Sequence, residues 1–195
     1  MSHVGRKLFH LLGGLGLLAL YFLLGRERAF IVYGTLVVLV LALEAARLAL
    51  PAWNRFLYEH FGSFIRKNEE RKLTGIAPYV LGIGLSLYAY PAPVASAAIC
   101  FLAFGDVAAT TVGERYGKRK IGNKSLEGTA GFVVASLAAG FILSFLGLGM
   151  PLWVVVLGAL CAAAIELLPL PVNDNFSIPL LTGAVMLFAL KWSAS

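Results

Sequence analysis

The chain has 195 residues, of which 59% are hydrophobic and 13% are charged, and its formal net charge is +6. Its mean hydropathy is +0.85, whereas a soluble domain typically has about 25% charged residues. This composition excludes an ordinary soluble globule and predicts one integral membrane domain over residues 1–195, an all-α bundle of transmembrane helices.

The apolar runs predict seven spans with short connections. Each run is close to the roughly 20 residues that a transmembrane helix needs, and glycine or proline marks several boundaries. The predicted helices cover residues 8–24, 29–50, 74–90, 92–112, 129–148, 151–168 and 176–192. The first run is long for a signal peptide and no small-residue cleavage site follows it, so we expect a retained helix.

The distribution of Lys and Arg predicts the orientation of the bundle. With the N-terminus in the cytoplasm, the opposite side of the membrane holds only Arg26, Arg28 and Lys191. This asymmetry favours an N-in and, with seven spans, C-out topology. The positive charge would then face anionic headgroups of the lipid bilayer. No aromatic and basic residues alternate in a soluble module, so we expect no nucleic-acid partner.

Polar residues of the predicted spans gather at the cytoplasmic end of the bundle. Asp106 lies in an apolar run, and a carboxylate at membrane depth costs roughly 2.5–3.5 kcal/mol on insertion scales, which makes it a functional-site candidate. The other members of this group are Arg6, Lys7, His10, Glu44, Arg47, Glu127, Glu166, Asp174 and Asn175. Structural roles stay open for several of them: Arg6 and Lys7 as membrane anchors, His10 as an interhelical hydrogen-bonding group, and Glu44 with Arg47 as a neutralising pair.

A basic, glycine-rich loop at residues 113–128 follows Asp106 directly. It is not a P-loop, because that motif needs a contiguous Gly-Lys-Ser/Thr after a strand. Backbone N–H groups of such a loop still bind phosphates, and Lys124 and Ser125 add a charge and a hydroxyl. An acidic residue in the membrane beside a basic loop predicts a magnesium–nucleotide site at the membrane surface.

These residues resemble the CTP-dependent polyprenol kinase family, which includes dolichol kinase, phytol kinase and the CTP-using diacylglycerol kinases. The resemblance runs nearly end to end, and it is most specific over residues 105–128. The matching positions are Arg6, Lys7, His10, Glu44, Leu73, Thr74, Gly75, Gly105, Asp106, Ala109, Gly113, Gly117, Lys118, Lys120, Ile121, Lys124, Ser125, Glu127, Gly128, Glu166, Asp174, Asn175 and Pro179. The larger dolichol kinases have additional N-terminal spans, and we expect this chain to be more like the short core enzymes.

The resemblance implies transfer of the γ-phosphoryl group of CTP to the hydroxyl of a membrane lipid alcohol at the cytoplasmic face. The acceptor would be a polyprenol, a phytol-type alcohol or diacylglycerol. Mg²⁺ would be held by Asp106 with Glu127 or Asp174, and His10 or another carboxylate such as Glu166 would accept the hydroxyl proton. The implied nucleotide-binding residues are Arg6, Lys7, Gly113, Gly117, Lys118, Lys120, Lys124, Ser125, Asp174 and Asn175.

Two other functions remain as alternatives. A cytidylyltransferase that makes a CDP-lipid from phosphatidate would also use CTP, Mg²⁺ and membrane helices, but it would release pyrophosphate where a kinase releases CDP. A small transporter would have polar residues at the membrane midplane and often repeated halves or broken helices. The polar residues of this chain gather at one face and show no evident repeat, which disfavours a transporter.

Overall fold

The structure, a computed structural model, describes residues 4–61, 69, 72–169 and 171–193. The side chains of Val4 and Arg6 lie outside the described part, so the prediction for Arg6 falls there. The described chain is helical apart from one short hairpin, which confirms the predicted fold class. Its elements are α1 Val4–Leu24, α2 Arg26–Ala49, α3 Pro51–Phe61, α4 Ile76–Ala89, α5 Ala92–Tyr116, β1 Lys120–Ile121, β2 Lys124–Ser125, α6 Leu126–Phe145, α7 Leu152–Leu167 and α8 Asp174–Ser193.

Among the described residues, five helices are long and apolar enough to cross a membrane, namely α1, α2, α5, α6 and α8. The helices α4 and α7 are apolar but shorter. Each of the seven predicted spans therefore coincides with a helix, although only five of these helices reach spanning length. The number of spans and their orientation stay predictions.

Besides shifts of a few residues at other helix ends, three local features differ from the predicted elements. Helix α5 continues to Tyr116, so Gly113 is helical, and α6 begins at Leu126, so Glu127 and Gly128 are helical as well. The apolar runs mark the part of a helix that fits the bilayer and miss its polar ends. Ser125 explains the early start of α6, because its hydroxyl oxygen accepts a hydrogen bond from the N–H of Gly128 at 3.1 Å and caps the helix.

The third difference is α3, which no apolar run predicted. It has 11 residues, too few for a span. Its aromatic side chains are partly exposed, and the ring of Trp53 stacks on that of Phe56 with centroids 5.4 Å apart. An amphipathic helix with exposed aromatic residues is typical of a segment that lies in the membrane interface.

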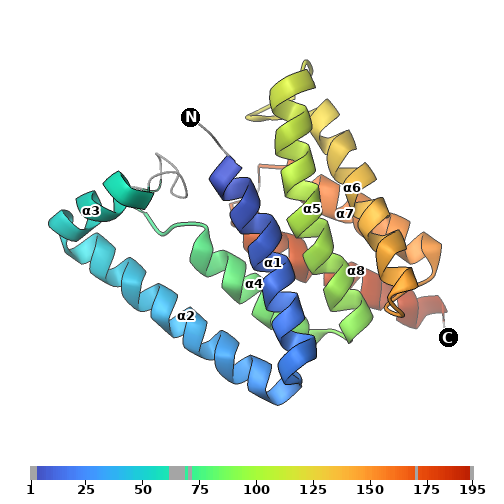
Figure 1. The fold of residues 1–195 in the computed structure, drawn as a ribbon. Helices are drawn as coiled ribbons and strands as arrows, with labels where there is room; N and C mark the ends of the chain where they lie inside the picture. Colours follow the sequence, from blue (N-terminus) through green and yellow to red (C-terminus); the bar gives the residue numbers. More distant parts are fainter. Residues whose placement is uncertain (1–3, 62–68, 70–71, 170, 194–195) are drawn as a thin grey trace.

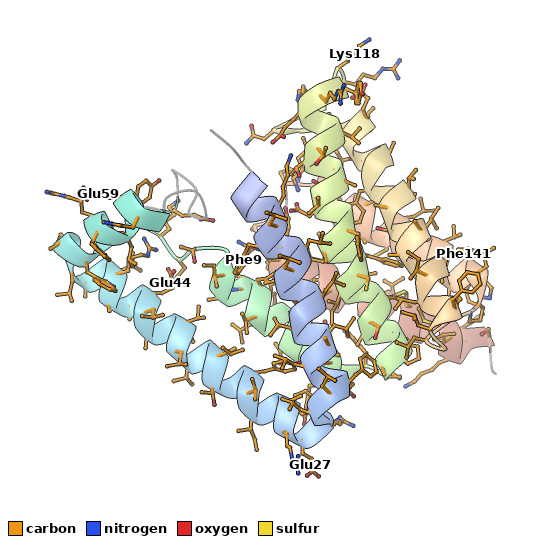
Figure 2. All side chains as sticks on the ribbon, in the orientation of Figure 1. Phe9, Glu27, Glu44, Glu59, Lys118 and Phe141 are labelled. Carbon is orange, nitrogen blue, oxygen red and sulfur yellow. The ribbon has the colours of Figure 1, made fainter. Side chains whose placement is uncertain are left out.

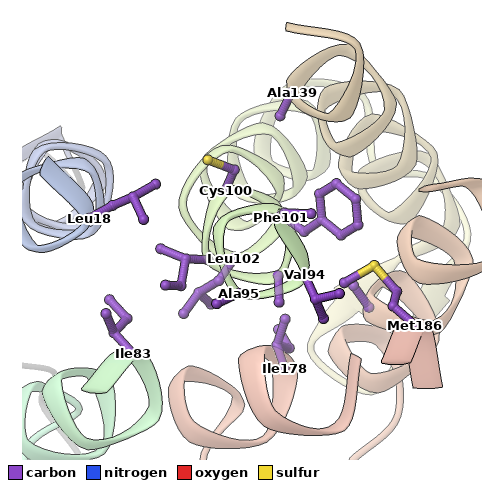
Figure 3. Close-up of a cluster of buried hydrophobic side chains, with 14 of the residues drawn as sticks. Leu18, Ile83, Val94, Ala95, Cys100, Phe101, Leu102, Ala139, Ile178 and Met186 are labelled. Atoms are coloured by element: carbon purple, nitrogen blue, oxygen red, sulfur yellow. The ribbon is translucent and has the colours of Figure 1, made fainter. Parts of the chain in front are cut away.

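Helix α5 is the centre of the bundle (Figure 1), and its first four turns are almost entirely buried. Phe101 of α5 has no exposed surface and lies among side chains from the surrounding helices (Figure 3), including Ala139 of α6 and Met186 of α8. Close packing depends on glycine: a Cβ added at Gly105 would lie 2.6 Å from the ring of Phe132 on α6. Such contacts between small and large side chains are typical of helices that pack in lipid.

The two ends of the bundle differ in what they carry. Figure 2 shows Lys118 beyond the end of α5 and Glu27 at the opposite end of the molecule, beside the turn between α1 and α2. The N-terminal end of α1 and the β1–β2 hairpin lie at the same end as Lys118 (Figure 1). The fold thus brings the start of α1, the end of α5 and the hairpin to one end of the bundle.

Candidate functional site

A pocket of about 310 Å³ lies at this end, between α5, the hairpin, the start of α6, the end of α7 and the start of α8. Four acidic residues line it, Asp106, Glu166 and Asp174 together with Glu114, and so do the lysines Lys120 and Lys124. The other lining residues are Ala109, Thr110, Gly113, Asn123, Ser125, Gly128 and Thr129. Acids and bases that are up to 68 residues apart in sequence therefore face one space, as the grouping of polar residues predicted.

A larger cavity of about 720 Å³ lies where α2 meets α3 and is lined by Arg47, Leu48, Pro51, Asn54, Arg55, Tyr58 and Glu59. None of the residues predicted for the nucleotide or the metal lines it. We therefore place the candidate site in the smaller pocket, because volume alone does not identify a binding site.

Lys124 connects the hairpin to the two helices on the far side of the pocket. Its Nζ lies 2.7 Å from Oδ2 of Asp174 and 3.1 Å from Oε1 of Glu166, and it also donates to the backbone carbonyl of Glu166. The Glu166 side chain is only 7% exposed, and a buried carboxylate is stable only with a partner of this kind. Lys124 is thus the cation that holds two acids in the pocket.

Asp106 faces both the pocket and α1. Its Oδ2 lies 3.9 Å from Nδ1 of His10, which is longer than a hydrogen bond but within the range of electrostatic attraction. The backbone carbonyl of His10 accepts a hydrogen bond from the hydroxyl of Tyr79 on α4, and the two rings are 4.8 Å apart. Gly14 leaves the space for that hydroxyl, since a Cβ there would lie 2.6 Å from it. The imidazole is therefore held beside Asp106 by contacts with a third helix.

Two further cations were predicted on α1. The Nζ of Lys7 lies 2.7 Å from Oε2 of Glu114, so this lysine forms an ion pair that connects α1 to α5 at the rim of the pocket. Arg6 is outside the described side chains.

The carboxylate of Glu127 forms hydrogen bonds with the backbone of the basic loop. Its carboxylate accepts hydrogen bonds from the N–H groups of Lys118 at 3.1 Å and Arg119 at 3.2 Å, and the residue does not line the pocket. Lys118 and Gly117 do not line it either. The carboxylate of Glu127 therefore holds the loop against the start of α6.

The glycines of the loop region serve close packing. A Cβ at Gly117 would lie 2.3 Å from the carbonyl oxygen of Gly113 and 2.7 Å from the hydroxyl of Ser125. A Cβ at Gly128 would lie 2.7 Å from the carbonyl oxygen of Ala109. These contacts bring the hairpin and α6 against the end of α5, and only Gly113 and Gly128 of the three line the pocket.

Asn175 and Glu44 of the polar group also lie outside the pocket. The side-chain amide of Asn175 donates to the carbonyl oxygen of Gly75 at 3.0 Å. Glu44 accepts hydrogen bonds from Arg47 and from Thr74, within a separate buried cluster. The interpretation of Glu44 and Arg47 as a neutralising pair agrees with their distance of 2.8 Å.

A divalent cation fits the pocket only together with a ligand. In the described part of the chain, no three His, Cys, Asp or Glu side chains are grouped closely enough to hold a metal ion by themselves. Mg²⁺ in phosphoryl-transfer sites takes one or two carboxylates and completes its shell with phosphate oxygens and water. Asp106, Glu166 and Asp174 offer such oxygens, and Oε2 of Glu166 is buried without a hydrogen-bond partner among the described residues.

Sequence reasoning missed five residues around the site. Thr110, Glu114, Asn123 and Thr129 line the pocket, and Tyr79 holds His10 in place. Helical periodicity would have found Thr110, since it is one turn after Asp106 and its hydroxyl donates to the Asp106 carbonyl at 2.8 Å. No local pattern marks Tyr79, because its partner is 69 residues away.

Comparison with known proteins identifies three relatives, each described as a CTP-dependent diacylglycerol kinase 1. The Eremothecium gossypii protein is 31% identical over 94% of this chain and 66% of its own length. The Saccharomyces cerevisiae protein is 27% identical over 79% of the chain and 61% of its own length, and the Schizosaccharomyces pombe protein is 29% identical over 51% and 47%. The chain thus spans about half to two thirds of the length of these relatives. No protein-family model and no solved structure matches it.

Proposed function

The chain belongs to a family of CTP-dependent lipid kinases, and from this premise we propose that it transfers the γ-phosphoryl group of CTP to the hydroxyl of a membrane lipid alcohol. Diacylglycerol is the acceptor that the names of the three relatives favour. Polyprenols and phytol-type alcohols are the acceptors to test beside it. The reaction would take place at the cytoplasmic face, where the Lys and Arg residues are concentrated.

The observation that carries the proposal is the composition of the pocket, which two lysines and four acidic residues line at one end of an apolar bundle. Phosphoryl transfer needs neutralisation of phosphate charge, alignment of the donor with the acceptor, and a group that takes the acceptor proton. Lysines meet the first need, and carboxylates provide oxygens for a divalent cation. A pocket that served only to stabilise the fold would have no reason to keep this many ionisable groups beside the membrane.

We assign the binding of the triphosphate to the hairpin side of the pocket. Lys124 and Lys120 would contact phosphate oxygens, and the hydroxyl of Ser125 lies at the same wall. Mg²⁺, when bound with the nucleotide, would be held by Asp106 and Asp174 and would neutralise phosphate charge. Glu127 has a different part in this scheme, since its carboxylate keeps the loop folded through the N–H groups of Lys118 and Arg119.

We assign to Asp106 and His10 the removal of the proton from the acceptor hydroxyl. Their side chains lie 3.9 Å apart at the boundary between α1 and α5. A neutral imidazole beside a carboxylate accepts a proton readily, because the carboxylate stabilises the imidazolium that forms. The lipid would approach from the bilayer with its hydroxyl directed toward this pair while its acyl chains stay among the exposed apolar side chains.

Purified protein in lipid vesicles tests the proposal. It should be given Mg²⁺, each nucleoside triphosphate in turn, and diacylglycerol, a polyprenol or phytol as acceptor. We expect CTP to be the preferred donor, with one equivalent of CDP released for each phosphorylated lipid. Release of pyrophosphate with a CDP-lipid product from phosphatidate would instead establish the cytidylyltransferase, and nucleotide-independent flux across the vesicle membrane would favour a transporter.

A further inference from the structure

A buried polar cluster lies away from the pocket, where the C-terminal end of α2 meets the segment that enters α4. Glu44 is 6% exposed and Arg47 is 2% exposed, and their side chains form an ion pair of 2.8 Å. Arg47 also donates to the side chain of Asn54 at 3.1 Å, and to the backbone carbonyls of Glu69 at 3.2 Å and Lys72 at 2.5 Å. This cluster fixes the segment before α4 to α2. Figure 2 shows Glu44 on the side of α2 that faces this segment.

Thr74 is the point where the cluster holds the chain most tightly. Its N–H donates to Oε2 of Glu44 at 3.0 Å and its hydroxyl donates to Oε1 at 2.8 Å, so both carboxylate oxygens are used. Thr74 is only 2% exposed. Two hydrogen bonds to one buried carboxylate leave the backbone little freedom at Thr74 and at Gly75, which follows it.

Gly75 connects this constrained segment to α8. Its carbonyl oxygen accepts a hydrogen bond from the side-chain amide of Asn175 at 3.0 Å. The two groups are close enough that a Cβ at Gly75 would lie 2.9 Å from that amide nitrogen. About two helical turns further along the chain, a Cβ at Gly82 of α4 would lie 2.5 Å from the backbone oxygen of Asn175. The start of α8 is therefore fitted against α4 at two points.

Asn175 and Asp174 are neighbours with opposite surroundings. Asn175 is 7% exposed and faces α4, whereas the side chain of Asp174 is 33% exposed and lines the pocket. Successive residues of a helix point about 100° apart, so fixing one of them sets the direction of the other. The position of Asp174, and of the Lys124 amine 2.7 Å from it, thus depends on the bond between Asn175 and Gly75.

We propose that Thr74 and Asn175 are positioning residues for the site, which act through Asp174 and are anchored on the buried pair of Glu44 and Arg47. The inference rests on the proposed function, in that it takes the pocket to bind the nucleotide. Neither residue needs to touch the ligand. A displacement of the order of 1 Å in a group that binds a reacting phosphate lowers the rate by about 100-fold, so a contact this remote still affects turnover.

The chemical class of ligand affected is the metal-bound triphosphate, because the constrained acid is a proposed metal ligand and contacts Lys124, the lysine assigned to the triphosphate. Loss of the anchor should raise the KM for Mg·CTP and lower kcat, while the KM for the lipid acceptor should stay within about twofold. A residue that merely stabilises the fold would change the amount of active protein and leave both KM values as they were.

The test is a double-mutant cycle on Thr74→Val and Asp174→Asn, with purified protein in vesicles. Valine keeps the shape of threonine and removes the hydroxyl bond to Glu44. We expect Thr74→Val alone to raise the KM for Mg·CTP about tenfold, and Thr74→Ser, which keeps the hydroxyl, to stay within twofold of the unmodified protein. In the Asp174→Asn background, Thr74→Val should add less than a twofold change.

Asn175→Ala provides the same test if Thr74→Val does not accumulate as folded protein, since it removes only the amide that binds Gly75. Tyr33→Phe is the matched control: it deletes the buried hydrogen bond from the Tyr33 hydroxyl to the Leu17 carbonyl, at 2.5 Å, outside the site. Tyr33→Phe should change the KM for Mg·CTP by the same factor in the unmodified protein and in the Asp174→Asn background.

Two results would overturn the inference while leaving the proposed function intact. One is that Thr74→Val and Asn175→Ala each lower activity by the same factor in the unmodified protein and in the Asp174→Asn background. The other is that Thr74→Val changes the KM for Mg·CTP and the KM for the lipid by no more than Tyr33→Phe does. Full activity of the Asp174→Asn single variant would overturn both the inference and the assignment of the pocket as the nucleotide site. This outcome is visible without the double variant.

Discussion

Lys124→Ala removes the only lysine of the described chain that contacts two of the pocket carboxylates at once. The amine lies 2.7 Å from Asp174 and 3.1 Å from Glu166. Without it, two acids face the space where we place a triphosphate, and their charges are no longer compensated. The variant should therefore bind nucleotide more weakly, and it should also be less able to neutralise charge on the transferred phosphoryl group.

The size of this effect follows from the contacts that are lost. A hydrogen bond to a charged group contributes about 1.5–3 kcal/mol, and the Lys124 side chain is 30% exposed, which weakens its electrostatic contacts through solvent screening. We therefore expect a loss of about 2 kcal/mol, which corresponds to about 30-fold in kcat/KM for Mg·CTP at 1.36 kcal/mol per tenfold. We expect the loss to be divided between KM and kcat, with the KM for the lipid little changed.

The assay is initial-rate kinetics with Mg·CTP varied at saturating acceptor. Arg119→Ala is the matched control, because it removes a cation from the same loop but Arg119 does not line the pocket; it should change kcat/KM by less than twofold. If both variants lose the same small amount and added anionic lipid restores both, the loop is only a membrane anchor. The nucleotide site would then have to lie elsewhere.

Three further predictions concern the metal, the topology and the packing. Asp106→Asn should lower kcat at least 100-fold, about 2.7 kcal/mol, in protein with unchanged thermal stability; near-normal turnover would remove Asp106 from the site. In a cysteine-free background, Asn123→Cys should be labelled from the cytoplasmic side and Ser193→Cys from the opposite side, and labelling of the loop from outside would contradict the orientation. Gly105→Ala should lower stability by about 1–3 kcal/mol through overpacking against Phe132, measured by thermal unfolding, and Phe132→Leu should recover part of the loss; an unchanged melting temperature would refute this packing.

The sequence was sufficient for the helices because lipid imposes a simple length and polarity rule. Seven apolar runs coincide with seven helices of the structure. The same rule does not predict α3, because this helix is too short to span the membrane and its polar residues interrupt the apolar pattern. It also ends helices too early, as at Gly113, because polar turns that extend beyond the bilayer remain helical.

The site was predictable in outline and not in detail. Topology alone indicated that Asp106, Glu166 and Asp174 share one end of the bundle, and the pocket contains all three. Which partner each side chain takes depends on distances that no local pattern encodes. Glu127 and Asn175 both stand in the motifs of the family, yet the carboxylate of one holds a loop and the amide of the other holds a helix.

Charge in a sequence indicates an ionisable group but not its partner. Lys124 and Asp174 are 50 residues apart, and nothing in either segment predicts their 2.7 Å contact. Tyr79 likewise gave no signal, although it fixes the ring that we propose as proton acceptor. Such pairs arise only when helices distant in sequence pack, so they require the structure.

In the proposed reaction, the γ-phosphate of CTP moves to a lipid hydroxyl in the pocket of Asp106 and Lys124. The most direct measurement uses CTP labelled at its γ-phosphate, diacylglycerol vesicles and Mg²⁺, with the unmodified protein and the Asp106→Asn variant side by side. We predict labelled phosphatidate from the unmodified protein, with matching CDP and at least 100-fold less label from the variant. Label recovered as pyrophosphate, or equal transfer by both proteins, would exclude phosphorylation of the lipid in this pocket.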